Sequence, residues 1–147
     1  MSSLKEEQLI NILPKDGPTV EEVKKYLKKY NDEFIVIKCG GSVLVNPDLF
    51  KIFIEDVSVL SKLGFNPIIV HGGGKRINSK LLEVNIKSNF INGLRITDKD
   101  TINIVEDVLI EFNKEIVEAL SEMSCKAKRI NTKENNIIFV TQENKSL

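Results

Sequence analysis

The sequence predicts an α/β fold with a mostly parallel sheet and flanking helices, and two observations carry that prediction. Two short β-branched runs, Phe34–Ile37 and Pro67–Val70, are each followed at once by a cluster of glycines. An apolar pattern of helical period separates the two runs, so the segment is predicted to form a strand, a helix and a second strand. Continuous apolar runs are typical of parallel strands buried on both faces, so we expect helices on both sides of the sheet.

Capping residues mark the helices in the first half of the chain. Upstream of the first strand, Thr19 and Glu22 are suited to a capping box for a basic helix that ends near Tyr30. Between the two strands, Asn46 is a good N-cap and Gly64 suits the position just after a helix. We therefore predict one helix ahead of the first strand and one between the strands.

The second half of the chain predicts two more helices and two more strands. One helix is expected over about residues 75–84, and a longer one after Thr97, where Thr97 and Asp100 resemble a capping box. Two short strands are expected near Ala127–Ile130 and Asn136–Thr141. The apolar stripe expected on the long helix consists of Ile102, Val105, Leu109, Phe112, Ile116, Leu120 and Met123.

Composition excludes several classes of function. The 147 residues contain 21 basic and 21 acidic side chains, which argues against a nucleic-acid or membrane-surface protein. No apolar run approaches the ~20 residues needed to cross a bilayer, and Met1–Ile10 does not have the pattern of a secretory signal. Cys39 and Cys125 match no metal or redox spacing, and a single histidine excludes a multi-histidine zinc site. We expect a cytoplasmic protein with free thiols and no bound metal.

The two glycine clusters are candidates for anion binding. In open α/β sheets, ligands bind beyond the carboxyl ends of the strands, where Lys38–Gly41 and His71–Gly74 both lie. Three glycines ahead of a helix offer unencumbered N–H groups to an anion, and Lys38 adds a positive charge. Tight turns are the alternative interpretation of both clusters. Neither cluster has the spacing of a dinucleotide fingerprint or a P-loop, and no nucleophile elbow accompanies the second one.

Three further residues are candidates with competing interpretations. Arg95 follows a glycine turn and precedes a helix, a placement suited to bidentate carboxylate recognition or, alternatively, to a surface salt bridge. His71 is interpreted as a structural histidine that shapes its loop, with a general base as the alternative. Cys39 lies between a lysine and two glycines, and nothing indicates that it is a nucleophile.

Taken in order, four segments resemble the amino acid kinase family and, within it, the acetylglutamate kinases. They are IVIKCGGS (35–42), NPIIVHGGGKRIN (66–78), NFINGLRITD (89–98) and VEDVLIEFNKEIVEAL (105–120). The resemblance covers about residues 20–140. It implies a three-layer sandwich of the family's type and ATP-dependent phosphorylation of the side-chain carboxylate of N-acetyl-L-glutamate, a step of arginine biosynthesis. It also implies ATP with Mg²⁺ as co-substrate and no prosthetic group.

The resemblance assigns roles to individual residues. Lys38 matches the catalytic lysine that stabilises the transferring phosphoryl group, and Gly40 and Gly41 match the loop that approaches the nucleotide phosphates. Gly73 and Gly74 match substrate-binding glycines, and Arg95 matches the arginine that holds the α-carboxylate of the substrate. The family's adenine site and second phosphate-binding lysine have no match here. We therefore expect residues 34–147 to be the N-terminal, substrate-binding half of a kinase domain, and the chain alone to be catalytically incomplete.

Residues 1–33 are predicted to form an N-terminal extension with a helix. In arginine-inhibited members of the family, a helix ahead of the first strand helps to build a hexamer and the inhibitor site, so a homo-oligomer and L-arginine as an inhibitor are implied. A basic, solvated helix is the alternative. For the whole chain, the alternatives are a noncatalytic binding or assembly module of the same fold, or a kinase for another small acidic substrate; the GLR segment at 93–95 argues against the latter.

Overall fold

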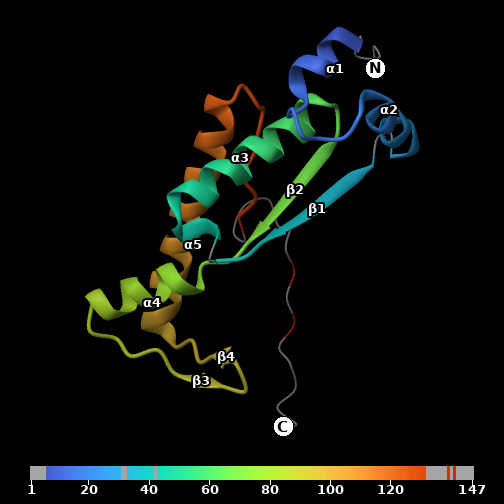
Figure 1. Cartoon of the computed structure of the whole chain (residues 1–147). Helices are drawn as coiled ribbons and strands as arrows, with labels where there is room; N and C mark the ends of the chain where they lie inside the picture. The colour runs from blue at the N-terminus through green and yellow to red at the C-terminus, as the bar shows by residue number, and fades with distance from the viewer. Residues whose placement is uncertain (1–5, 31–32, 42, 132–138, 140, 142–147) are drawn as a thin grey trace.

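The computed structural model describes residues 6–30, 33–41, 43–131, 139 and 141, with ten helices and strands among them. Figure 1 shows helices along one side of a long strand pair, the N-terminal helices at its upper end, and a small hairpin at the far end. In chain order, the elements are α1 (Glu6–Ile12), α2 (Val20–Lys29), β1 (Phe34–Cys39), the 3-10 helix η1 (Val43–Val45), α3 (Pro47–Lys62), β2 (Asn66–His71), α4 (Gly74–Glu83), β3 (Phe90–Ile91), β4 (Leu94–Arg95) and α5 (Lys99–Glu122).

The predicted strand–helix–strand unit is confirmed. Strands β1 and β2 pair in parallel, in a register that runs from Phe34 opposite Asn66 to Cys39 opposite His71. Helix α3 connects them, with Asn46 as its N-cap; the Asn46 side chain accepts hydrogen bonds from the backbone N–H groups of Asp48 and Leu49. The fold class, α/β with a parallel sheet and flanking helices, is therefore as the sequence predicts.

One face of the β1–β2 pair carries the main core. Cys39 is buried there with side chains from α3 and α5, and Ile37 and Ile69 pack against the same cluster. Figure 1 shows α3 and α5 on this side of the sheet. The buried members of the cluster are Cys39, Ile54, Val57, Phe112, Ile116, Leu120 and Cys125.

The opposite face of the same strands is exposed, which corrects the expectation of burial on both faces. Phe34 and Val36 on β1 are 69% and 66% exposed, and Val70 on β2 is 48% exposed. Burial alternates along each strand because successive side chains point to opposite faces and, within the described residues, helices pack on one of them only.

The N-terminal residues pack on the rest of the chain through α1, a helix that the sequence did not predict. Leu9 of α1 is 1% exposed and forms a small core with Val23 of α2 and Leu63 at the end of α3. The predicted capping box of α2 is present: the Thr19 side chain accepts from the Glu22 N–H, and the Glu22 carboxylate accepts from the Thr19 N–H. The hydrogen bonds that the Thr19 N–H and the Thr19 hydroxyl donate to this carboxylate lower the pKa of Glu22.

Helix α4 agrees with its prediction, whereas α5 begins one residue later than expected. Asp98, and not Thr97, is the N-cap of α5, because the Asp98 carboxylate accepts from the Thr101 N–H at 2.8 Å. The Thr97 hydroxyl instead donates to the Arg95 carbonyl at 3.4 Å. The buried face of α5 also differs at its start from the predicted apolar stripe, since Ile102 is 48% exposed and Thr101 is buried.

The predicted strand at Ala127–Ile130 is wrong, since the structure assigns no strand there. The Asn113 side chain of α5 donates to the Ile130 carbonyl at 3.4 Å, and this segment and β2 both line a cavity of about 360 Å³. The segment is thus tied to α5 and does not pair with β2. Most of the other predicted strand, Asn136–Thr141, lies outside the described residues.

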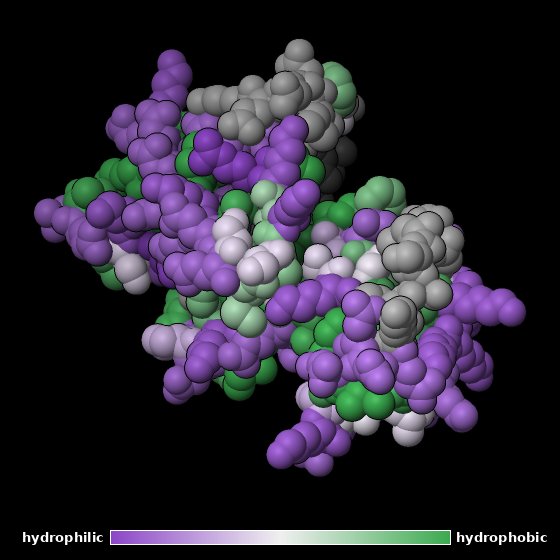
Figure 2. All heavy atoms as spheres, turned by 90° about the horizontal axis from the view of Figure 1, so that it is seen from above, coloured by the Kyte–Doolittle hydropathy of each residue, from purple (hydrophilic) through white to green (hydrophobic). Residues whose placement is uncertain are grey.

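The described surface is mainly hydrophilic, with separate apolar patches, as Figure 2 shows from above. None of the described helices has the length and hydropathy that a membrane span requires. Among the described residues, histidine, cysteine and carboxylate side chains form no group of three or more that could hold a metal ion.

Candidate functional site

The two glycine loops leave the sheet side by side. Cys39 lies opposite His71 in the parallel register, so the residues that follow them, Gly40 and Gly72, begin their loops at the same end of neighbouring strands. Neighbouring strands lie about 4.8 Å apart, which places the loops within the reach of one phosphate-sized or carboxylate-sized ligand. The predicted convergence of the two clusters is therefore a feature of the fold.

The first loop presents a lysine and two unobstructed glycines. Lys38 is exposed and occupies the same face of β1 as Val36, the face that the helices leave open. A Cβ atom added to Gly40 or Gly41 would have no described atom within 4 Å. The Gly40 carbonyl accepts from the Val43 N–H at 3.2 Å, which turns the chain into η1.

The second loop forms the N-terminus of α4. Gly73 is the N-cap, and no side chain caps the first turn, so the N–H groups there are available to an anion. Gly73 is buried, and a Cβ atom on it would lie 2.8 Å from Leu109 Cδ2 of α5 and 3.3 Å from Ile77 Cδ1. Gly74 differs, because a Cβ atom there would meet no described atom within 4 Å.

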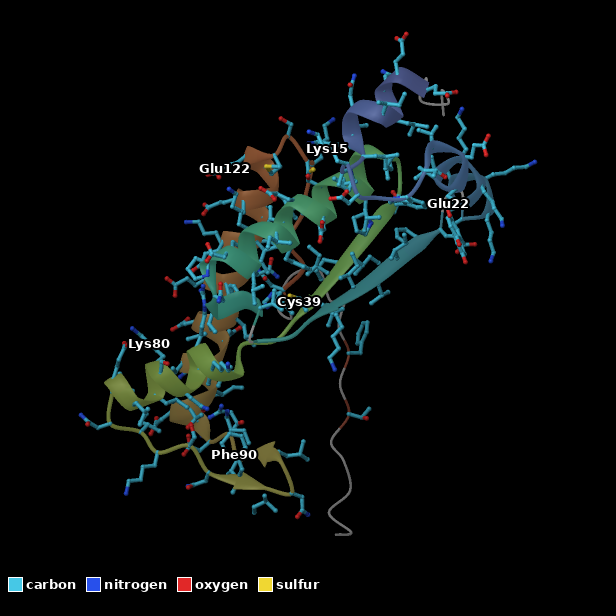
Figure 3. The ribbon with its side chains drawn as sticks, viewed as in Figure 1. Lys15, Glu22, Cys39, Lys80, Phe90 and Glu122 are labelled. Atoms are coloured by element: carbon cyan, nitrogen blue, oxygen red, sulfur yellow. The ribbon has the colours of Figure 1, made fainter. Side chains whose placement is uncertain are left out.

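His71 and Cys39 lie on the helix-covered face, away from Lys38. The His71 ring packs edge-on against Phe112 with 5.1 Å between ring centroids, and its Nδ1 is buried without a hydrogen-bond partner. Burial raises the pKa of the Cys39 thiol, which disfavours the nucleophilic thiolate. Figure 3 shows Cys39 near the end of β1. The placement of Cys39 agrees with its structural interpretation. His71 also packs against the core, but its Nδ1 forms no hydrogen bond with a described residue through which it could shape its loop.

Arg95 lies on a hairpin that the sequence analysis did not predict as one. Strands β3 and β4 pair antiparallel, with Phe90 opposite Arg95. The Asn92–Gly93 turn between them has positive φ at both residues, 50° and 80°, as a type I′ hairpin turn requires. An Asn-Gly pair between apolar residues is the signal that could have identified this hairpin.

The structure places Arg95 against α4, the helix that follows the second glycine loop. Its guanidinium Nη2 donates to Asn78 Oδ1 at 2.6 Å, and its Nη1 donates to Ser88 Oγ. Its Cζ lies 4.7 Å from the centroid of the Phe90 ring, which Figure 3 labels on the hairpin. Asn78 and Ser88 were not identified as site residues from the sequence. No described carboxylate forms a salt bridge with Arg95.

Curated proteins with similar sequences are acetylglutamate kinases. One from Pelagibacter ubique (strain HTCC1062) is 88% identical over 147 residues, which are 100% of this chain and 51% of that protein. Another, from Caldanaerobacter subterraneus subsp. tengcongensis, is 42% identical over 118 residues, covering 80% of this chain and 40% of that protein. The chain thus spans about half the length of the curated relatives it matches.

Two solved structures support the fold. The structure of smu.665 from Streptococcus mutans UA159 aligns with a TM-score of 0.57 and 30% identity over 67% of this chain and 40% of that one. An N-acetylglutamate synthase from Neisseria gonorrhoeae, complexed with coenzyme A and N-acetyl-glutamate, aligns with a TM-score of 0.58 over 71% and 24% of the two chains; at 21% identity this is a likeness of fold alone. The family described as the amino acid kinase family matches residues 33–146, most of the sequence, and the chain therefore belongs to the amino acid kinase family.

Proposed function

We propose that the chain is the substrate-binding part of an ATP-dependent kinase that phosphorylates the side-chain carboxylate of N-acetyl-L-glutamate. The observation that carries the proposal is the Cys39–His71 register, which puts a lysine-bearing glycine loop beside the N-terminus of α4. Arg95 is hydrogen-bonded to Asn78 of that same helix. One end of the site thus suits phosphates and the other a carboxylate. The similar curated kinases support this substrate.

The reaction needs no covalent enzyme intermediate. An oxygen of the substrate's side-chain carboxylate attacks the γ-phosphorus of ATP, a C–O–P bond forms, and the bond to the β-phosphate oxygen breaks. ADP leaves with the bonding electron pair, and no proton has to move. The protein's contribution is to align the two anions and to offset their charge.

Lys38 and the two glycine loops supply that contribution. The exposed ammonium of Lys38 stands at the carboxyl end of β1, where it offsets charge on the transferring phosphoryl group. The open space above Gly40 and Gly41 admits the phosphates close to the backbone, and the N–H groups at the start of α4 bind the substrate beside Gly73 and Gly74.

Mg²⁺ would arrive with the nucleotide. Phosphate oxygens are ligands that Mg²⁺ prefers, and the nucleotide would supply them. The ion would then offset phosphate charge, and the chain's own share of that task falls to Lys38 and the backbone N–H groups.

A chimera tests the proposal. These 147 residues replace the corresponding part of the Pelagibacter ubique relative, and acyl-phosphate formation from ATP is measured with N-acetyl-L-glutamate, L-glutamate and N-acetyl-L-aspartate. We expect activity that prefers N-acetyl-L-glutamate, and Lys38→Ala should lower kcat by about 10²–10³-fold while KM changes little. Lys51→Ala, an exposed lysine on α3, is the control. A Lys38→Ala kcat within about threefold of the parent would refute the catalytic role.

The alternative, a noncatalytic binding module, predicts N-acetyl-L-glutamate binding and no turnover even in the chimera. A cytoplasmic location stays a prediction from the unpaired cysteines, and homo-oligomeric assembly and inhibition by L-arginine stay predictions from the resemblance. Light scattering of the chain and of the chimera tests the assembly, and the acyl-phosphate assay on the chimera with and without L-arginine tests the inhibition. Because Leu9 is buried against Val23, surface substitutions of α2 lysines are better test variants than deletion of the N-terminal residues.

A further inference from the structure

The Arg95 guanidinium is held by two neutral side chains that also bond to each other. Arg95 Nη2 donates to Asn78 Oδ1 at 2.6 Å, Arg95 Nη1 donates to Ser88 Oγ, and the Ser88 hydroxyl donates to Asn78 Oδ1 at 3.1 Å. Arginine has only donors, so the amide oxygen of Asn78 must face it. The three side chains form a closed ring of three hydrogen bonds, in which Asn78 Oδ1 accepts twice and the Ser88 hydroxyl both accepts and donates.

The charge of Arg95 is left without a described counter-ion. Arg76, two residues before Asn78 on α4, shows the contrast, since its Nη1 lies 2.7 Å from the Glu115 carboxylate. The partners of Arg95 are an amide and a hydroxyl, which hold the guanidinium but do not neutralise it. The two bonds use one N–H on each Nη atom, so the second N–H of each and the Nε–H remain for a planar acceptor such as a carboxylate.

The ring also fixes where Arg95 lies relative to the second glycine loop. Asn78 is four residues after Gly74 on α4, about 6 Å along the helix axis. Two apolar side chains of the hairpin that carries Arg95, Ile91 and Leu94, are 61% and 67% exposed. The hydrogen bonds to Asn78, made directly and through Ser88, link the hairpin to α4.

We propose that Asn78 and Ser88 are positioning residues that hold Arg95 beside the second glycine loop and keep its charge available to the α-carboxylate of the substrate. The proposal rests on the proposed function, in which Arg95 binds that carboxylate. It explains why a neutral amide suits residue 78: an aspartate there would hold the guanidinium equally well, yet would offset its charge and repel an incoming carboxylate.

The test compares two ligands, N-acetyl-L-glutamate and its α-amide, N-acetyl-L-isoglutamine, which lacks the α-carboxylate. The ratio of their dissociation constants is measured by calorimetry on the 147-residue chain, and the ratio of their KM values on the chimera. The variants are Asn78→Ala, Asn78→Asp, Ser88→Ala and Arg95→Ala. Ser79→Ala is the control, since the exposed Ser79 hydroxyl donates to the Lys75 carbonyl of its own helix and, within the described part of the chain, forms no hydrogen bond with Arg95. The ratio does not depend on the fraction of unfolded protein, because unfolding raises the apparent dissociation constants of both ligands by the same factor.

We expect the parent and Ser79→Ala to prefer the acid by about tenfold or more, the typical contribution of a hydrogen-bonded charge. Asn78→Ala, Asn78→Asp and Arg95→Ala should reduce that preference to near one, and Ser88→Ala should reduce it in part. Asn78→Asp should do so without lowering the melting temperature, which separates loss of charge from loss of structure. If Arg95→Ala abolishes the preference and Asn78→Asp retains it, the positioning role is wrong and the proposed function stands. If the parent shows no preference, or Arg95→Ala retains it, both fail.

Discussion

Leu109 Cδ2 of α5 lies 2.8 Å from the position that a Cβ atom on Gly73 would occupy. Helix α5 therefore packs directly on the second glycine loop, and Ile77 and Val108 continue the contact between α4 and α5 in a small core of their own. Packing against α5 alone explains why residue 73 is a glycine, without reference to a bound ligand. Gly74 carries no such requirement, so the two neighbouring glycines can be separated by experiment.

Gly73→Ala should destabilise the chain by about 1–2 kcal/mol, because the new methyl group overlaps Leu109 and because alanine is a poor N-cap. Gly74→Ala should change the free energy of unfolding by less than about 0.5 kcal/mol, since its Cβ enters open space. Urea denaturation measures both. The double variant Gly73→Ala/Leu109→Ala is the control, and strictly additive effects in it would contradict the packing explanation.

Arg95→Lys should raise the KM for N-acetyl-L-glutamate by about tenfold in the chimera, with kcat nearly unchanged, because lysine keeps the charge but loses the planar fork. The matched control is Arg76→Lys. Arg76 pairs with Glu115 at 2.7 Å and its Cζ lies 4.0 Å from the Phe112 ring centroid, so this change should lower the melting temperature and leave KM alone. An unchanged KM in Arg95→Lys at saturating ATP would remove Arg95 from the site.

The elements that the sequence predicts well are those with strong local signals, namely helix-capping residues and β-branched runs. Asn46 and Thr19 cap their helices as expected, and the β-branched runs before Gly40 and Gly72 form the parallel pair. Capping and strand propensity act over a few residues, so these features can be read from the sequence without knowing the tertiary structure.

The predictions that failed depend on contacts between distant residues. Burial on both faces of β1 requires a second helical layer, and an apolar run such as that at Val36 does not reveal which layer is present. The strand expected at Ala127–Ile130 needs an edge to pair with, and Asn113 holds Ile130 by its carbonyl instead. The ring of Asn78, Ser88 and Arg95 joins residues 7 to 17 positions apart, a relationship that spacing in the sequence does not encode.

The N-cap of α5 should make stability depend on pH in the acidic range. The hydrogen bonds from Thr101 lower the pKa of Asp98 below its ordinary value of 3.8. Because the folded-state pKa is the lower one, the unfolded chain binds the proton more readily, and the contribution of Asp98 is fully present above the ordinary pKa and lost as the pH falls through the folded value. In melting curves between about pH 7 and pH 2, the parent should lose more stability than Asp98→Asn, whose amide caps without titrating. Parallel curves for the two proteins would contradict this account.

The 147-residue chain by itself should bind N-acetyl-L-glutamate weakly and show no measurable kinase turnover. Arg95, Gly73 and Gly74 are all within it, so the substrate carboxylates have donors. The chain spans about half the length of its curated relatives. The resemblance to the family assigns none of its residues to the adenine site or to the second phosphate-binding lysine, so we expect it to hold ATP at the phosphate end only. A phosphoryl transfer that relies on positioning loses up to ~7–11 kcal/mol of its advantage when one reactant is unrestrained.

Calorimetry with N-acetyl-L-glutamate and an acyl-phosphate assay on the purified chain check the two halves of the prediction. ATP-dependent acyl-phosphate formation by this chain alone, abolished by Lys38→Ala, would show that these residues already hold both substrates in line.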